Sequence, residues 1–109
     1  MTVRDWIEQR RPSIHSALAE RVLAALGADA NVAMESTPDV CLSAAVRCLD
    51  ALLSSNRFER ESAVELLTVD ALTTYAFEYA SESSPSADEV AALARRGAQL
   101  FGQLATQRV

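Results

Sequence analysis

The chain has 109 residues and a formal net charge of −5, and its ten basic residues are all arginine. A domain of this length buries roughly two-thirds of the surface that its unfolded chain exposes, so residues 1–109 are expected to form a single domain with its own core. The acidic charge and the scattered arginines disfavour nucleic-acid binding, and no apolar run approaches the roughly 20 residues of a membrane-spanning helix. Because the N-terminal residues MTVRDWIEQRR are also too polar for a signal peptide, the sequence predicts a cytoplasmic protein.

The first helical segment is predicted to begin after Thr2, because Thr2 and Asp5 have the spacing of a capping box. Apolar residues then recur at helical spacing as far as Leu26, and Gly27 ends the pattern. Pro12 interrupts this segment, since proline lacks the backbone N–H group and clashes with the preceding helical turn. We expect either a kink at Pro12 or a short helix before it and a longer helix that begins there.

A second helix follows residues 27–37, which have no sustained period and are predicted to form a loop. Thr37 is expected to be its N-cap, with Pro38 at the first helical position, where the missing N–H group of proline does no harm. The apolar stripe of this helix ends near Ser55, so the helix is expected to stop there.

The third and longest helix is predicted over residues 59–82. Its apolar residues fall on several adjacent lines rather than on one stripe, so its apolar surface is broad. A four-helix unit has room for one central seam, and a soluble protein avoids leaving a large apolar surface in water. Pairing about a twofold axis would cover that surface. The sequence therefore predicts a homodimer, with the interface residues Leu66, Val69, Tyr75 and Tyr79.

The last helix is predicted to follow a loop over residues 81–86. Ser86 and Glu89 have the spacing of a capping box, which would open this helix. Gly97 and Gly102 lie inside it, where each costs about 1 kcal/mol relative to alanine. We interpret the two glycines as marks of a close helix crossing or of a weak point in the helix.

These segments together predict an all-α fold. Half of the residues are hydrophobic, and glycine and proline number only three each. Alanine and leucine, both strong helix formers, dominate the hydrophobic residues. Short polar connections between the helices favour antiparallel neighbours, so the expected architecture is a small antiparallel bundle of four to five helices.

The sequence contains few residues that could carry chemistry. His15 is the only histidine, and a catalytic triad would rest on it alone. Cys41 and Cys48 lie seven residues apart, about 10 Å along a helix, which is too far for a disulfide, so both are expected to be reduced. Because both lie on or beside the apolar stripe of the second helix, they are also expected to be largely buried. Glu61 and Glu65 have i,i+4 spacing, but a two-metal site in a bundle needs more carboxylates and histidines from other helices. No catalytic residue, metal ligand or cofactor is therefore predicted.

One likeness to a known family lies in residues 66–78, which read LLTVDALTTYAFE. They resemble the LLAGDALLTLAFE helix of the trans-isoprenyl diphosphate synthases, the farnesyl and geranylgeranyl diphosphate synthase family. Residues 6–12, WIEQRRP, together with the apolar residues that follow, are similar to the first helix of that family. Residues 92–103, ALARRGAQLFGQ, are similar to the helix that in the family ends in Gly-Gln followed by Asp.

The departures from this family concern the groups that hold its substrates. The family binds the magnesium complex of an allylic diphosphate through DDxxD and the second diphosphate through GGKRxRP. This chain has no lysine and no paired aspartates, and residues 52–60 read LLSSNRFER where DDxxD and its arginines would stand. Gln103 is followed by Leu104 instead of aspartate. The resemblance therefore implies a shortened relative of the synthases that does not catalyse prenyl transfer.

Two hypotheses of function follow. The first is a noncatalytic helical protein that works by association with itself or with a protein partner, such as a full-length synthase. The second is a small carrier or enzyme that binds a hydrophobic, prenyl-like ligand between helices. A cavity lined by Leu72, Phe77, Leu100 and Phe101 would favour the second, and a continuous apolar outer face would favour the first. The predicted ligand or polar-seam residues are Asp70, Thr73, Thr74, Phe77 and Gln103.

Overall fold

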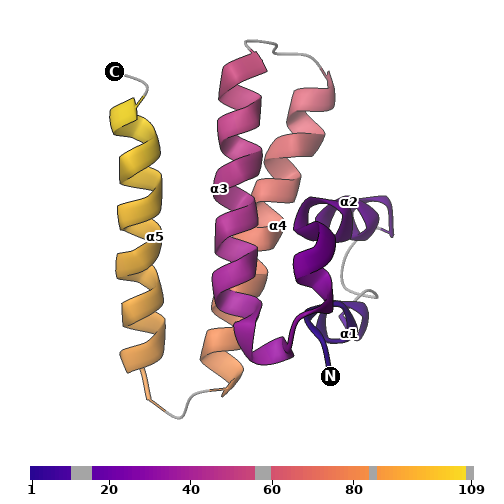
Figure 1. Cartoon of the computed structure of the whole chain (residues 1–109), viewed down its shortest axis with the longest axis vertical. Coiled ribbons are helices and arrows are strands. Elements are labelled where there is room, and N and C mark those ends of the chain that lie inside the picture. The colour runs from indigo at the N-terminus through magenta and orange to yellow at the C-terminus, as the bar shows by residue number, and fades with distance from the viewer. Residues whose placement is uncertain (11–15, 56–59, 84–85, 108–109) are drawn as a thin grey trace.

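The computed structural model describes residues 1–10, 16–55, 60–83 and 86–107 and is an all-α bundle, as the sequence predicts. Its elements in chain order are α1 (Val3–Glu8), α2 (Ser16–Leu26), the 3-10 helices η2 (Gly27–Asn31) and η3 (Met34–Ser36), α3 (Thr37–Ser55), α4 (Arg60–Ser83) and α5 (Asp88–Gln107). The long helices α3, α4 and α5 run antiparallel in succession, with α1 and α2 on one side of the α3–α4 pair and α5 on the other (Figure 1). The described residues contain no strand.

The N-terminal helix begins as its sequence predicts. The Asp5 amide donates to the Thr2 hydroxyl at 3.2 Å, and the Thr2 amide donates back to the Asp5 carboxylate at 2.9 Å, which completes the capping box. The hydrogen bond from the Thr2 backbone lowers the pKa of Asp5 below its usual value. Two separate helices, α1 and α2, occupy the segment in which a break was expected, while Pro12 lies outside the described residues.

The segment between α2 and α3 is more ordered than the predicted loop. Gly27 ends α2 with a φ of 58°, a conformation that glycine adopts without steric cost. The 3-10 helices η2 and η3 have five and three residues, too few to leave a period in the sequence. Thr37 is not the N-cap that was expected, because its own backbone is helical and its hydroxyl donates to the Met34 carbonyl.

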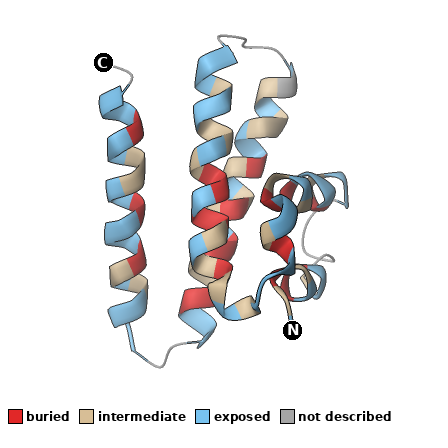
Figure 2. Ribbon diagram, in the orientation of Figure 1, coloured by how far each residue is buried: buried red, intermediate tan, exposed pale blue. Residues whose placement is uncertain are grey.

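The core lies between the α3–α4 pair and the N-terminal helices. Buried residues concentrate in the halves of α3 and α4 that α1 and α2 cover, while the opposite ends of both helices are mostly exposed or half-buried (Figure 2). The small buried residues Ala44 and Ala45 of α3 let the α4 backbone approach, and α3 with α4 forms the most extensive helix pair. The largest fully buried side chains are Ile7, Leu42, Leu72 and Leu93.

Helix α5 packs on α3 and on the C-terminal end of α4 through one stripe (Figure 1). Leu93, Gly97 and Leu104 are its buried residues. A Cβ atom at Gly97 would lie 3.6 Å from the Leu42 side chain, whereas one at Gly102 would meet nothing within 4 Å. Gly97 therefore lies at the contact between α5 and α3 but at an ordinary distance that leaves room for a Cβ atom, so neither glycine marks the close helix crossing that was predicted. An ion pair between Arg96 and Asp39 adds a second link between α5 and α3.

The connection between α4 and α5 differs from the predicted loop over 81–86. Helix α4 continues to Ser83, so residues 81–83 are helical. The Ser86 hydroxyl accepts a hydrogen bond from the Asp88 amide at 3.4 Å. The predicted capping box would instead use the amide of Glu89, one residue further along the chain. Helix α5 then begins at Asp88, whose negative charge suits a helix N-terminus.

The two cysteines are both free thiols and differ in burial. Burial raises the pKa of Cys41 to about 12 and, together with Glu65, raises that of the half-buried Cys48. Only the thiolate reacts with a maleimide. At a fixed pH below the pKa, each unit by which the pKa rises lowers the thiolate fraction about tenfold. We expect Cys48 to be labelled much faster than Cys41 in the native protein. Mass spectrometry of timed samples checks this, with the urea-unfolded chain as control; equal native rates would contradict it.

Candidate functional site

Most of the ligand and interface residues predicted from the sequence lie on helix α4. This helix has a buried inner face and an exposed outer face. Its inner face consists of the buried residues Thr68, Leu72, Tyr75, Ala76, Tyr79 and Ala80. The outer face of α4 consists of exposed residues on the opposite side: Arg60, Ala63, Leu66, Leu67, Asp70, Thr74 and, two turns further on, Ser81. From position 60 to position 74 these residues occur at every turn of the helix, so their side chains form one strip along it.

Two adjacent leucines dominate the apolar part of the outer face. Leu66 is 52 % exposed and Leu67 is 54 % exposed, the highest fractions in the described chain for a large hydrophobic residue other than Met1. Val69, also predicted at an interface, is half-buried and packs against the core. Of the four predicted interface residues, Leu66 is therefore the one that is presented to solvent.

Tyr75 and Tyr79 correct the sequence prediction, because they lie in the core of the single chain. Their exposed fractions are 3 % and 8 %. Both rings meet the indole of Trp6 edge to face, with ring centroids 5.8 Å from Tyr75 and 5.4 Å from Tyr79. These aromatic residues pack helix α1 against helix α4 and leave little ring surface for a second chain.

Arg10 closes this aromatic cluster at its solvent side. Its guanidinium carbon lies 4.2 Å above the centre of the Trp6 ring. The same guanidinium pairs with Glu78 at 3.1 Å and with Glu82. We call Trp6, Arg10, Tyr75 and Tyr79 the Trp6 cluster.

The Tyr75 hydroxyl is the polar atom that the Trp6 cluster leaves without a hydrogen-bond partner in the part of the chain that the structure describes. Burial, followed by the negative charge of Glu78, raises the pKa of Tyr75. The hydroxyl is therefore neutral at physiological pH. It could act only as a buried donor or acceptor, since a buried phenol with a raised pKa does not ionise easily.

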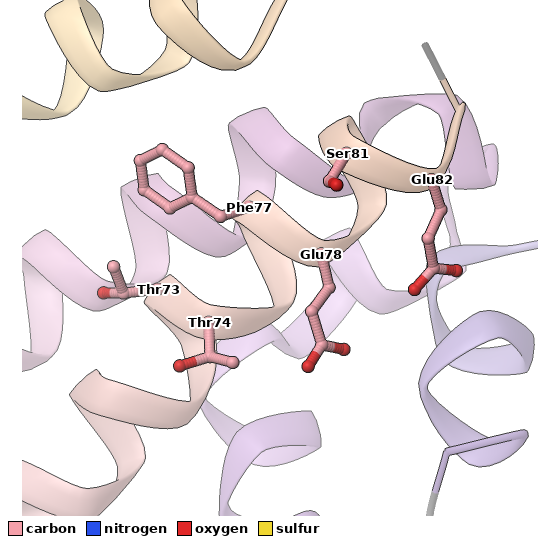
Figure 3. A pocket seen from close by; sticks show the side chains of 6 residues that line it. All are labelled: Thr73, Thr74, Phe77, Glu78, Ser81 and Glu82. Carbon is pink, nitrogen blue, oxygen red and sulfur yellow. The ribbon is translucent and has the colours of Figure 1, made fainter. Parts of the chain in front are cut away.

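A shallow hollow of about 440 Å³ lies beside α4 and brings together three of the predicted ligand residues, Thr73, Thr74 and Phe77. Glu78, Ser81 and Glu82 complete its lining. Thr74 and the two carboxylates point to one side of the helix and Phe77 points to the other (Figure 3). The Thr73 hydroxyl donates to the Val69 carbonyl at 2.9 Å, so the helix itself uses this group. Carboxylates at the edge of an open hollow do not suit an anionic diphosphate.

The remaining two predicted ligand residues lie elsewhere. Asp70 is exposed on the outer face of α4, so the polar seam predicted inside the bundle from Asp70, Thr73 and Thr74 is not formed. Gln103 is exposed on α5 and lines a separate hollow of about 160 Å³ between α3 and α5. The polar side chain that α4 does bury is Thr68, whose hydroxyl donates to the Val64 carbonyl one turn earlier.

Among the described residues, no three His, Cys, Asp or Glu side chains come together in a way that could hold a metal. None of the described helices combines the length and the apolar character that crossing a membrane requires. The fold and the outer face of α4 together define the chain as a small all-α bundle in which one side of α4 is exposed to solvent. Comparison with protein-family models, with curated proteins and with solved structures gives no match.

Sequence reasoning did not find the Trp6 cluster or its carboxylate partners. Arg10 and Glu78 are separated by 68 positions, and no local pattern marks two residues so far apart as neighbours. The available signal was weaker: a single tryptophan at helical spacing near the N-terminus and two tyrosines four residues apart on a long helix. Aromatic rings on one helix face are often core residues, which would have placed both tyrosines inside.

Proposed function

We propose that this is a noncatalytic helical protein that works by association through the outer face of α4, as a homodimer or with a protein partner. The observation that carries the proposal is the pair Leu66 and Leu67, each more than half exposed on one strip. Neighbouring large apolar side chains on a regular helix are a common feature of helix-mediated interfaces. The exposed Asp70 at the end of this apolar stretch would belong to the polar rim of such an interface.

The proposed setting is the cytoplasm, supported by two free thiols in a chain that has no other cysteine. The proposed lineage is that of a shortened isoprenyl diphosphate synthase, supported by the sequence of residues 66–78. A full-length synthase is then one candidate for the protein partner.

The second candidate function is a carrier for a hydrophobic ligand. It is favoured by the hollow that joins Thr73, Thr74 and Phe77. Ligand sites usually enclose most of the ligand surface, however, and this hollow is open and edged by Glu78 and Glu82. Leu72 is fully buried in the core and is not among the residues that line the hollow beside Phe77. Association is therefore the better-supported proposal.

Light scattering tests the association. At tens of micromolar we expect a mass of roughly twice the 11.8 kDa of one chain. The double variant Leu66→Gln with Leu67→Gln removes the apolar pair while keeping residues that favour a helix, so it is expected to return the mass of one chain. Val32→Gln is the matched control, because Val32 is also an exposed hydrophobic residue and lies outside α4. A strictly monomeric wild-type protein would remove the homodimer.

Calorimetry separates the two candidate functions. The chain is titrated with an allylic diphosphate in the presence of magnesium. Micromolar binding would overturn the noncatalytic proposal in favour of the carrier or enzyme, since the groups that hold diphosphate in the synthases are missing from this sequence.

A further inference from the structure

The outer face of α4 carries opposite charges on the two sides of its apolar stretch. Arg60, the first residue of α4, is exposed at one end, and Asp70 is exposed beyond the leucines at the other. Arg10, Arg21 and Arg96 all pair with carboxylates. Neither Arg60 nor Asp70 forms an ion pair with another of the described residues. A strip with a cation at one end and an anion at the other is complementary to a second copy of itself that runs in the opposite direction.

One register satisfies both the charges and the shapes. If two copies of α4 pack antiparallel with the twofold axis at the level of Glu65, Arg60 lies opposite the partner's Asp70. In the same register Leu67 lies opposite the partner's Ala63, because Ala63 and Leu67 are equally far from Glu65 in sequence, as Arg60 and Asp70 are. A small residue facing a large one allows two helices to interdigitate.

The helix N-terminus favours the same pairing. Arg60 places a positive charge at the positive end of the α4 dipole, which is an unfavourable position. The antiparallel register brings a carboxylate from the second copy to that end, where an anion is favourable. The charge pair and the dipole therefore act in the same direction.

We infer that the partner of the outer face of α4 is a second copy of this chain, packed antiparallel so that Arg60 pairs with Asp70 of the partner subunit and Leu67 packs over Ala63 of the partner subunit. This inference rests on the proposed function, because it specifies the partner and the register of the same surface. The twofold axis generates this ion pair twice in each dimer, so one substitution changes two contacts at once.

Exchange of the charges tests the register. Arg60→Glu alone sets two carboxylates against each other at both pairs, and Asp70→Arg alone sets two cations against each other. Each single variant is expected to bind itself roughly tenfold or more weakly than the wild-type protein does, with a smaller difference at high salt. An equimolar mixture of the two variants restores both pairs, so the mixture is expected to return to the dimer mass. Both positions are exposed, and far-UV circular dichroism checks that each variant remains helical.

A second variant tests the shape of the contact without any change of charge. Ala63→Leu places a large side chain opposite the partner's Leu67 and is expected to weaken the dimer several-fold. Ala94→Leu is the control, because Ala94 is an exposed alanine on α5.

The outcomes separate this inference from the proposed function. A dimer that dissociates on Leu66→Gln with Leu67→Gln, but whose charge variants are not rescued by mixing, overturns the register and leaves the proposed surface in place. A dimer that is indifferent to the leucine substitutions overturns both. Recovery of the dimer mass only in the mixture supports the antiparallel pairing.

Discussion

Trp6→Ala is expected to lower the free energy of unfolding by about 3–5 kcal/mol, the range for removal of a buried large aromatic side chain. Trp6 is only 7 % exposed and is in edge-to-face contact with both Tyr75 and Tyr79. Each such contact contributes about 0.5–1.5 kcal/mol beyond area burial. Since a domain has a total stability of about 5–15 kcal/mol, this one change should remove a large part of it.

Urea unfolding followed by far-UV circular dichroism measures this loss, at one protein concentration because association would also raise the apparent stability. Two controls divide the effect. Trp6→Phe keeps an apolar ring and should lose less, while Arg10→Gln removes the cation above the ring and the partly exposed ion pairs, for about 1 kcal/mol or less. A cost for Trp6→Ala below about 1 kcal/mol would mean that α1 does not pack on α4 in solution.

The helices could be predicted from the sequence because their signals are local. The Thr2 and Asp5 box starts α1, Gly27 ends α2, and the apolar period of α3 stops where the helix stops, at Ser55. The errors fall on connections. The 3-10 helices between α2 and α3 are too short to have a period, and Thr37 uses its hydroxyl within a turn instead of capping a helix.

The candidate site was predicted less well, because its residues are selected by contacts distant in sequence. The spacing of the apolar residues shows that α4 is apolar on several sides. Which of these sides α1 covers depends on where Trp6 packs. That packing puts Tyr75 and Tyr79 inside and leaves Leu66 outside. Asp70 gives the opposite lesson: a charge within an apolar run can simply mark the solvent face, and it need not indicate a buried polar partner.

The second large expected effect is at the contact between α3 and α5. Leu42 is 1 % exposed, and Leu42→Ala is expected to cost about 2–5 kcal/mol because it leaves a cavity between the two helices. Gly97 of α5 lies directly against the Leu42 side chain, and Gly102 lies on the same helix with open space around it. These glycines form a matched pair, since replacement of either by alanine should raise helix propensity by about 1 kcal/mol.

A double-mutant cycle uses this pair to show whether α5 packs on Leu42. A Cβ atom at Gly97 would lie at ordinary contact distance from Leu42, so Gly97→Ala should be tolerated in the wild-type background. In the Leu42→Ala background the added methyl group would also fill part of the cavity, for a further gain of about 0.8 kcal/mol. Gly102→Ala should stabilise both backgrounds equally, to within about 0.3–0.5 kcal/mol, because a Cβ atom at Gly102 would contact neither Leu42 nor any other side chain within 4 Å. If the effect of Gly97→Ala on the free energy of unfolding is the same in both backgrounds, as expected for Gly102→Ala, the α3–α5 contact is refuted. If only the effect of Gly97→Ala depends on the residue at position 42, α5 packs against Leu42 through its one buried stripe.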